Sequence, residues 1–157
     1  MIYVCIPSYN EGPTIGLVLW KIRKVFQEFP REYQILVADD GSSDGTAEVR
    51  SSTCGSRISV SIQLDEQRRV LAISQTVQAC AFGQASAALV EHYAAGRDHA
   101  EVASAMLQLS RWLSGHQEDA GEWPGLTALE PARARQTRHG AIILPFRALL
   151  AALEAAR

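Results

Sequence analysis

The first fifty residues have the hydrophobic pattern of a strand, a helix and a second strand, separated by polar loops. An apolar run covers Ile2 to Ile6, and a second one covers Tyr33 to Ala38. Between them, apolar side chains recur at steps of three and four, which is the spacing of one helix face: Ile15, Leu19, Ile22, Phe26 and Phe29. Buried strands joined by a crossover helix are typical of parallel sheets, so this segment predicts a β-α-β unit.

The loops that follow the two strands are expected at one edge of the sheet, because the carboxyl ends of parallel strands meet there. The first loop belongs to Ile6-Pro7-Ser8-Tyr9-Asn10-Glu11, and the second is Asp39-Asp40-Gly41-Ser42-Ser43-Asp44-Gly45-Thr46. The two carboxylates that open the second loop can accept hydrogen bonds from a base edge or a ribose hydroxyl, Tyr9 offers a ring, and the glycines allow close backbone approach. We therefore expect the loops to be two halves of a nucleotide pocket.

Residues 2–49 resemble the start of a family-2 glycosyltransferase with the GT-A fold, through the IPSYNE and VADDGSSDGT motifs. The resemblance implies contacts to a nucleotide-sugar donor from Pro7, Tyr9, Glu11, Asp39 and Asp40. The family's next acidic motif, Asp-x-Asp, holds Mg or Mn on the donor diphosphate, and it does not occur in the sequence after the second loop. The resemblance thus implies an inactive, donor-binding glycosyltransferase fragment, and a purely structural β-α-β fragment is the alternative.

The pattern changes near Ser51 to strict alternation of apolar and polar residues. Ile58, Val60, Ile62 and Leu64 share one face, which predicts a half-solvated strand, and residues 70–77 predict an antiparallel return strand. Helices are predicted over residues 81–95, with an apolar face of Ala85, Ala88, Leu89 and His92 or Tyr93, from Asp98 to Gly115, and over residues 141–156. A polar segment over residues 116–131 separates the last two, and we expect Trp112, Trp123 and Leu126 to be core anchors.

The predicted fold class is therefore α+β, with a boundary near residue 50. Residues 1–50 form a truncated β-α-β unit, and residues 51–157 form a small antiparallel sheet packed on helices. At the join, Asp44 or Thr46 has the chemistry of a helix start, although few residues remain before the next strand. Because two parallel strands are too few for an independent sheet, we expect the carboxyl-terminal unit to be the better folded of the two.

Three cysteines, Cys5, Cys54 and Cys80, are an odd number, which argues against a disulfide framework. Cys80 lies where a predicted strand ends and a helix begins, and helix N-termini stabilise thiolates. Cys54 precedes the first strand of the hairpin, so strand pairing can bring both thiols to the same end. Two cysteines provide half of a tetrahedral metal site, and a buried structural thiol is the alternative role for Cys80.

Residues 52–155 resemble a U-type iron-sulfur cluster scaffold of the NifU/IscU/SufU family. The resemblance rests on Cys54-Gly55-Ser56, on Cys80 within ACAFGQASA and on the tail RHGAIILPFRAL. It implies a cluster or zinc site at one end of the sheet, held by three cysteines and an acidic residue. Cys54 and Cys80 match, whereas Ser56 stands at the acidic position and Ala141 at the third cysteine. His139, two residues earlier, is a candidate imidazole ligand, with a surface or capping role as the alternative.

Together these patterns predict a scaffold-like protein with a degenerate site for an iron-sulfur cluster, iron or zinc, fused to a partial sugar-nucleotide-binding segment. We expect no enzymatic activity, with glycosyl transfer as the alternative and Mg or Mn only in that case. The expected partners are a cysteine desulfurase, a second copy of the chain or a nucleotide-sugar. The net charge of -2 gives no basis for nucleic-acid binding. Without a signal peptide or a membrane span in the sequence, we expect a cytoplasmic protein.

Overall fold

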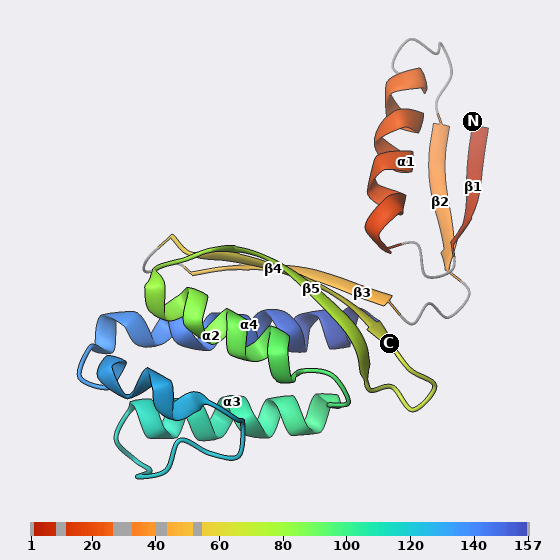
Figure 1. The fold of residues 1–157 in the computed structure, drawn as a ribbon. Helices are drawn as coiled ribbons and strands as arrows, with labels where there is room; N and C mark the ends of the chain where they lie inside the picture. The colour runs from red at the N-terminus through yellow and green to blue at the C-terminus, as the bar shows by residue number, and fades with distance from the viewer. Residues whose placement is uncertain (1, 9–11, 27–32, 40–43, 52–54, 157) are drawn as a thin grey trace.

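The computed structural model describes residues 2–8, 12–26, 33–39, 44–51 and 55–156 of the chain (Figure 1). The described elements, in chain order, are β1 (Ile2–Ser8), α1 (Gly12–Phe26), β2 (Tyr33–Asp39), β3 (Asp44–Arg50), β4 (Arg57–Leu64), β5 (Val70–Gln78), α2 (Ala81–Tyr93), α3 (His99–Leu113), the 3-10 helix η1 (Leu126–Ala132) and α4 (Gln136–Ala155). The strands form a two-stranded sheet, β1-β2, and a three-stranded sheet, β3-β4-β5. This mixture confirms the predicted α+β class.

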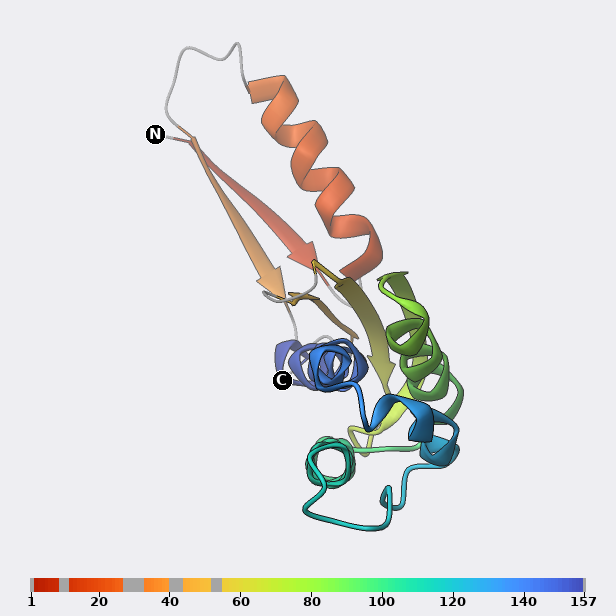
Figure 2. The same cartoon turned by 90° about the vertical axis from the view of Figure 1, so that its left-hand side faces the viewer.

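The amino-terminal unit is the predicted β-α-β segment, with β1 and β2 parallel and in register from Ile2 opposite Tyr33 to Ser8 opposite Asp39. The helix α1 lies along this pair of strands in both views (Figures 1 and 2). Two strands cannot cover the whole helix, so α1 also exposes large apolar side chains, namely Leu17, Val18, Trp20 and Val25. Trp20 and Val25 are 57% and 72% exposed. The unit therefore leaves part of its apolar surface in contact with solvent.

The second sheet is antiparallel throughout, and the helices α2, α3 and α4 lie on one side of it (Figures 1 and 2). In β4 the four alternating apolar residues are buried against the helices, while Ser59 and Ser61 are half-exposed on the other side. This burial is what the alternation of apolar and polar residues dictates for a sheet covered on one face. The predicted hairpin of β4 and β5 is confirmed.

The segment from Asp44 to Arg50 is a strand, so the predicted helix start at Asp44 or Thr46 is wrong. The burial of β3 alternates, with Gly45 buried, Thr46 exposed and Ala47 half-buried, and its full length pairs with β4. A Cβ atom on Gly45 would collide with the carbonyl oxygen of Ala152 and lie 2.9 Å from the Cβ of Ala156, both in the last turns of α4 or just after it. The strands of the second sheet thus begin at Asp44, ahead of the boundary expected near residue 50.

The helices α2 and α4 pack together through small residues. The buried face of α2 consists of Gly83, Ser86, Ala87 and Val90, rather than the predicted face that contains Ala85 and Ala88, both of which are exposed. The Ser86 hydroxyl donates to the Ile142 carbonyl at 2.6 Å, which joins the two helices inside the core. The last helix begins at Gln136, five residues before the predicted start.

The core of the carboxyl-terminal unit is mainly aliphatic and includes the aromatic side chains of Trp112, Trp123 and Phe146. Trp112 and Trp123 are 1% and 4% exposed, and Leu126 is 1% exposed, which confirms all three predicted anchors. The rings of Trp123 and Phe146 meet edge to face with centroids 5.1 Å apart. Among the helices of the described residues, none combines the length and the apolar character needed to cross a membrane.

Candidate functional site

The segment before β4 and the segment after β5 lie at the same end of the sheet. The last residue pair of the hairpin is Arg57 with Gln78, and the Ser51 backbone N–H donates to the Ser56 carbonyl at 2.8 Å. Cys54 lies outside the described residues. The neighbouring Ser56, at the position where the resemblance expects an acid, is 5% exposed. The register therefore puts Ser56 and the start of α2 at one end of the sheet, and the meeting of the Cys54 and Cys80 thiols stays a prediction.

Cys80 is the N-cap residue of α2 and is half-exposed. Its backbone is extended, with φ -65° and ψ 169°, and its side chain makes no capping hydrogen bond. The Gln84 backbone N–H donates to the Cys80 carbonyl at 2.9 Å, and the Gln84 amide donates to the Ala79 carbonyl at 2.9 Å. These two hydrogen bonds fix the turn without the Cys80 thiol. Binding of a metal by the thiol would therefore break no capping hydrogen bond.

The start of α4 packs on the first turn of α2, close to Cys80 in the chain. A Cβ atom on Gly83 would lie 3.2 Å from the Ala141 carbonyl oxygen and 3.5 Å from the Ala141 Cβ. Arg135 places its guanidinium 5.6 Å from the centroid of the Phe82 ring. Ala141, at the position of the third family cysteine, is fully buried. Thus α2 and α4 bring the second and third cysteine positions of the resemblance to neighbouring turns, and the third carries only a methyl group.

His139 holds the end of η1. Its Nε2 lies 3.2 Å from the Ala132 carbonyl oxygen and 3.0 Å from that of Arg133. Carbonyl oxygens only accept, so Nε2 carries the proton and Nδ1 keeps its lone pair in the neutral ring. This is the capping role that was one of the two expectations for His139. In metal-bound imidazoles the N–H of the second ring nitrogen commonly donates a hydrogen bond to a carbonyl in this way, so the contact is compatible with a ligand role through Nδ1.

The donor set in the described part of the chain is small. No group of three or more His, Cys, Asp or Glu side chains that could hold a metal ion occurs among the described residues. Cys80 supplies one thiol and His139 one imidazole nitrogen at most. With Cys54, which lies outside the described residues, the chain would offer three donors, so a four-coordinate metal would need one more from outside the chain.

The predicted nucleotide contacts fall mainly outside the described residues, where Tyr9, Glu11 and Asp40 lie. Pro7 and Asp39 occupy the carboxyl ends of β1 and β2, at the same edge of the sheet, as the register shows. Their role as donor contacts stays a prediction. Gly45, expected to allow close approach of backbone to a nucleotide, instead allows close approach of β3 to α4.

Sequence reasoning missed the residues that join α2 to α4. Gly83 and Ser86 lie three and six residues after Cys80, and both are buried against α4. The sequence feature that could have indicated this buried face is the spacing of small residues within ACAFGQASA. Gly83 and Ser86 are three residues apart, so they lie on the same narrow face of a helix. An alanine-rich helix otherwise offers little hydrophobic contrast from which to choose its buried face.

The three-stranded sheet packed on helices has the fold of NifU-like and SufU-like iron-sulfur scaffolds. A NifU-like protein (N-terminal part) from Brucella abortus superposes with a TM-score of 0.66 and 27% identity, over 71% of this chain and 77% of that one. An iron-sulfur cluster assembly scaffold protein for the SUF system, from Fervidobacterium islandicum AW-1, gives a TM-score of 0.63 and 18% identity, over 69% and 79% of the two chains.

The amino-terminal sequence matches glycosyltransferases. The family model Glycosyl transferase family 2 matches residues 3–80, a longer segment than the 2–49 expected. The chain is 39% identical over 46 residues (29% of its length) to an undecaprenyl-phosphate 4-deoxy-4-formamido-L-arabinose transferase of Photorhabdus laumondii, and 32% identical over 83 residues (50% of its length) to CsbB of Bacillus subtilis, described as a glycosyltransferase. It spans only 14% and 25% of these two proteins. The chain thus combines a glycosyltransferase-like segment with a scaffold-like fold, and the family-model match extends through the three strands of the second sheet, β3, β4 and β5.

Proposed function

We propose that the carboxyl-terminal unit is a scaffold-like protein that holds iron, zinc or an iron-sulfur cluster as cargo at a degenerate site formed by Cys54, Cys80 and His139. The observation that carries this proposal is the packing of the start of α4 on the first turn of α2 at the sheet end that carries Cys80. The likeness to NifU-like and SufU-like scaffolds supports it.

The three candidate ligands suit a metal site of low affinity rather than one in which the chain supplies all four ligands. Thiolate and imidazole donors fit zinc and ferrous iron, and thiolates fit iron-sulfur clusters. Buried Ala141 supplies no donor where the resemblance expects a third cysteine. We infer that the remaining metal ligand comes from a second copy of the chain or from a partner such as a cysteine desulfurase. We also propose that the protein works in the cytoplasm.

The test is anaerobic elemental analysis with visible absorption spectra after reconstitution with iron and sulfide, and separately with zinc. The parent chain is compared with the Cys54→Ser/Cys80→Ser double variant, and Cys5→Ser is the matched control because Cys5 is exposed on β1, in the other unit. The proposal predicts metal in the parent and in Cys5→Ser, and its loss in the double variant. Equal metal in all three chains, or none in the parent, would contradict it.

A second candidate function is binding of a nucleotide-sugar by the amino-terminal segment, with Mg or Mn on the diphosphate. The family-2 match and the shared edge of Pro7 and Asp39 favour it. The test is titration calorimetry with UDP and with GDP in the presence of magnesium. Binding that is weakened in Asp39→Ala and Asp40→Ala, but not in the exposed Glu66→Ala control, would support it. Absence of binding by either nucleotide would leave the segment without this role.

A further inference from the structure

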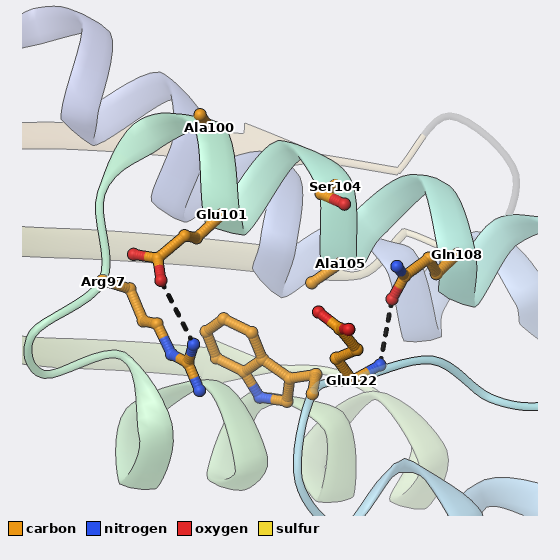
Figure 3. Close-up of a pocket in the computed structure, with 8 residues that line it drawn as sticks. Arg97, Ala100, Glu101, Ser104, Ala105, Gln108 and Glu122 are labelled. Atoms are coloured by element: carbon orange, nitrogen blue, oxygen red, sulfur yellow. Dashed lines mark hydrogen bonds and ion pairs between the residues drawn. The ribbon is translucent and has the colours of Figure 1, made fainter.

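A cavity lies between α3 and the segment that leads from α3 to η1. Its volume is about 310 Å³, at the small end of the range for ligand sites. Ala100, Ser104 and Ala105 line it from α3, and Glu122 lies across from them (Figure 3). Trp123, the residue after Glu122, also lines the cavity. A space of this size accommodates a small molecule or one long side chain. None of its lining residues belongs to the candidate metal site.

The Trp123 side chain, which lines the cavity, is buried and hydrogen-bonded. Trp123 is 4% exposed, its Nε1–H donates to the Leu89 carbonyl at 3.3 Å, and its ring packs on Phe146. The guanidinium of Arg97 lies 5.6 Å from the Trp123 ring centroid and pairs with Glu101 at 3.4 Å. Glu101 also pairs with Arg69 at 2.9 Å, and Arg69 pairs with Asp98 at 3.3 Å. The two carboxylates together balance the two guanidinium groups, so this end of the cavity carries no net charge.

Glu122 contributes an uncompensated negative charge. Its backbone N–H donates to the Gln108 side-chain oxygen at 2.9 Å, which holds the segment against α3. Its carboxylate makes no hydrogen bond or ion pair with any described residue. Figure 3 shows the side chain on the cavity side, toward Ala105. The cavity therefore combines a free carboxylate, an indole and methyl groups within one small volume.

We propose that this cavity binds a primary alkylammonium group, with the ammonium at Glu122 and the alkyl chain along Trp123 and the alanines of α3. A carboxylate beside an apolar wall suits an alkylammonium group, through an ion pair of the ammonium with Glu122 and apolar contacts of the alkyl chain with Trp123 and the alanines. An anion would be repelled by the Glu122 carboxylate, and a neutral ligand would leave the Glu122 charge unpaired. The alkylammonium comes from a free amine or from a lysine side chain of a partner protein.

The test follows the three indole N–H signals of the full chain, labelled with ¹⁵N-tryptophan, in two-dimensional NMR spectra. The ligands are pentylamine, the neutral isostere pentanol and the tripeptide acetyl-Gly-Lys-Gly-amide. The signals of Trp20 and Trp123 are assigned from Trp20→Phe and Trp123→Phe. The variants are Glu122→Gln and the control Glu118→Gln, which removes an exposed carboxylate from the same segment outside the cavity lining.

The proposal predicts a saturable shift of the Trp123 signal with an ammonium ligand and a much weaker response to pentanol. We expect Glu122→Gln to weaken the affinity about fivefold, as for an ion pair open to solvent, and Glu118→Gln to leave it unchanged. Saturation by pentylamine alone identifies a free amine as the ligand, and saturation by the lysine tripeptide identifies a protein side chain. The proposal is overturned if neither ligand shifts Trp123, if pentanol acts equally well, or if Glu122→Gln binds like the parent.

Discussion

Replacing Gly45 by alanine tests whether the glycosyltransferase-like sequence really supplies a strand of the scaffold fold. The added Cβ would collide with the Ala152 carbonyl oxygen and approach the Ala156 backbone nitrogen to 3.0 Å. Overpacking of this kind costs about 3 kcal/mol when backbone rather than a mobile side chain must move. The loss of unfolded-state entropy on replacing glycine by alanine returns up to about 1 kcal/mol. We therefore expect Gly45→Ala to lower the free energy of unfolding by about 2 kcal/mol.

The assay is urea unfolding followed by the fluorescence of the buried tryptophans and by circular dichroism. With a denaturant slope of about 2 kcal/mol/M, the midpoint should fall by about 1 M. Gly140→Ala is the matched control, because Gly140 lies in α4 and a Cβ atom added there would meet nothing within 4 Å outside its own helix turn. The free energy of unfolding of Gly140→Ala should rise by about 0.5 to 1 kcal/mol, because alanine has a higher helix propensity than glycine. A Gly45→Ala midpoint equal to that of the parent would refute the packing of β3 on α4.

Three further predictions concern the site and its surroundings. Ala141→Cys should raise metal occupancy above that of the parent in the elemental analysis, at a cost in stability of about 1 kcal/mol from overpacking; unchanged occupancy would contradict the assigned third position. His139→Ala should lower the unfolding free energy by about 1 kcal/mol through loss of its bonds to the Ala132 and Arg133 carbonyls, and the metal content should fall with it; metal content equal to the parent's would remove His139 from the ligand set. The Asp98 backbone N–H and the nearby Arg69 hold the pKa of Glu101 below its ordinary value. The ionised Glu101 therefore stabilises the fold above the pKa of the unfolded chain, and this stabilisation is lost as the pH falls through the pKa of the folded chain. The thermal unfolding temperature of Glu101→Gln should depend less steeply on acid pH than that of the parent, and identical pH profiles would exclude this linkage.

Local patterns sufficed for the elements whose partners are neighbours in the chain. Alternation along β4 predicted the buried face of the hairpin, and the capping box of Asp98 and Glu101 marks the predicted start of α3. The strand β3 was missed because its pattern is short and its first residues have helix-capping chemistry. What makes it a strand is pairing with β4 and packing on Ala152 and Ala156, which lie far away in the chain.

The candidate site was predictable at Cys80, whose place at a strand-to-helix junction follows from local periodicity. The sequence does not decide between the two roles of His139, because these depend on its carbonyl partners. Ala132 and Arg133 lie at the end of the 3-10 helix η1, and the sequence predicts a polar connection there instead of a helix. The Glu122 and Trp123 cavity could not be predicted, since it depends on how that segment folds back on α3. Long-range packing thus decided what the local sequence pattern left open.

The most direct test of the central claim, that the scaffold sheet begins inside the glycosyltransferase-like sequence, is native-state amide hydrogen exchange across the full chain. Amides that hydrogen-bond along a strand exchange with the free energy of the cooperative unit to which the strand belongs. We expect the bonded amides of β3 to be protected as strongly as those of β4, and those of β1 and β2 to exchange faster. Protection of β3 at the level of β1 and β2, with β4 and β5 more stable, would contradict it.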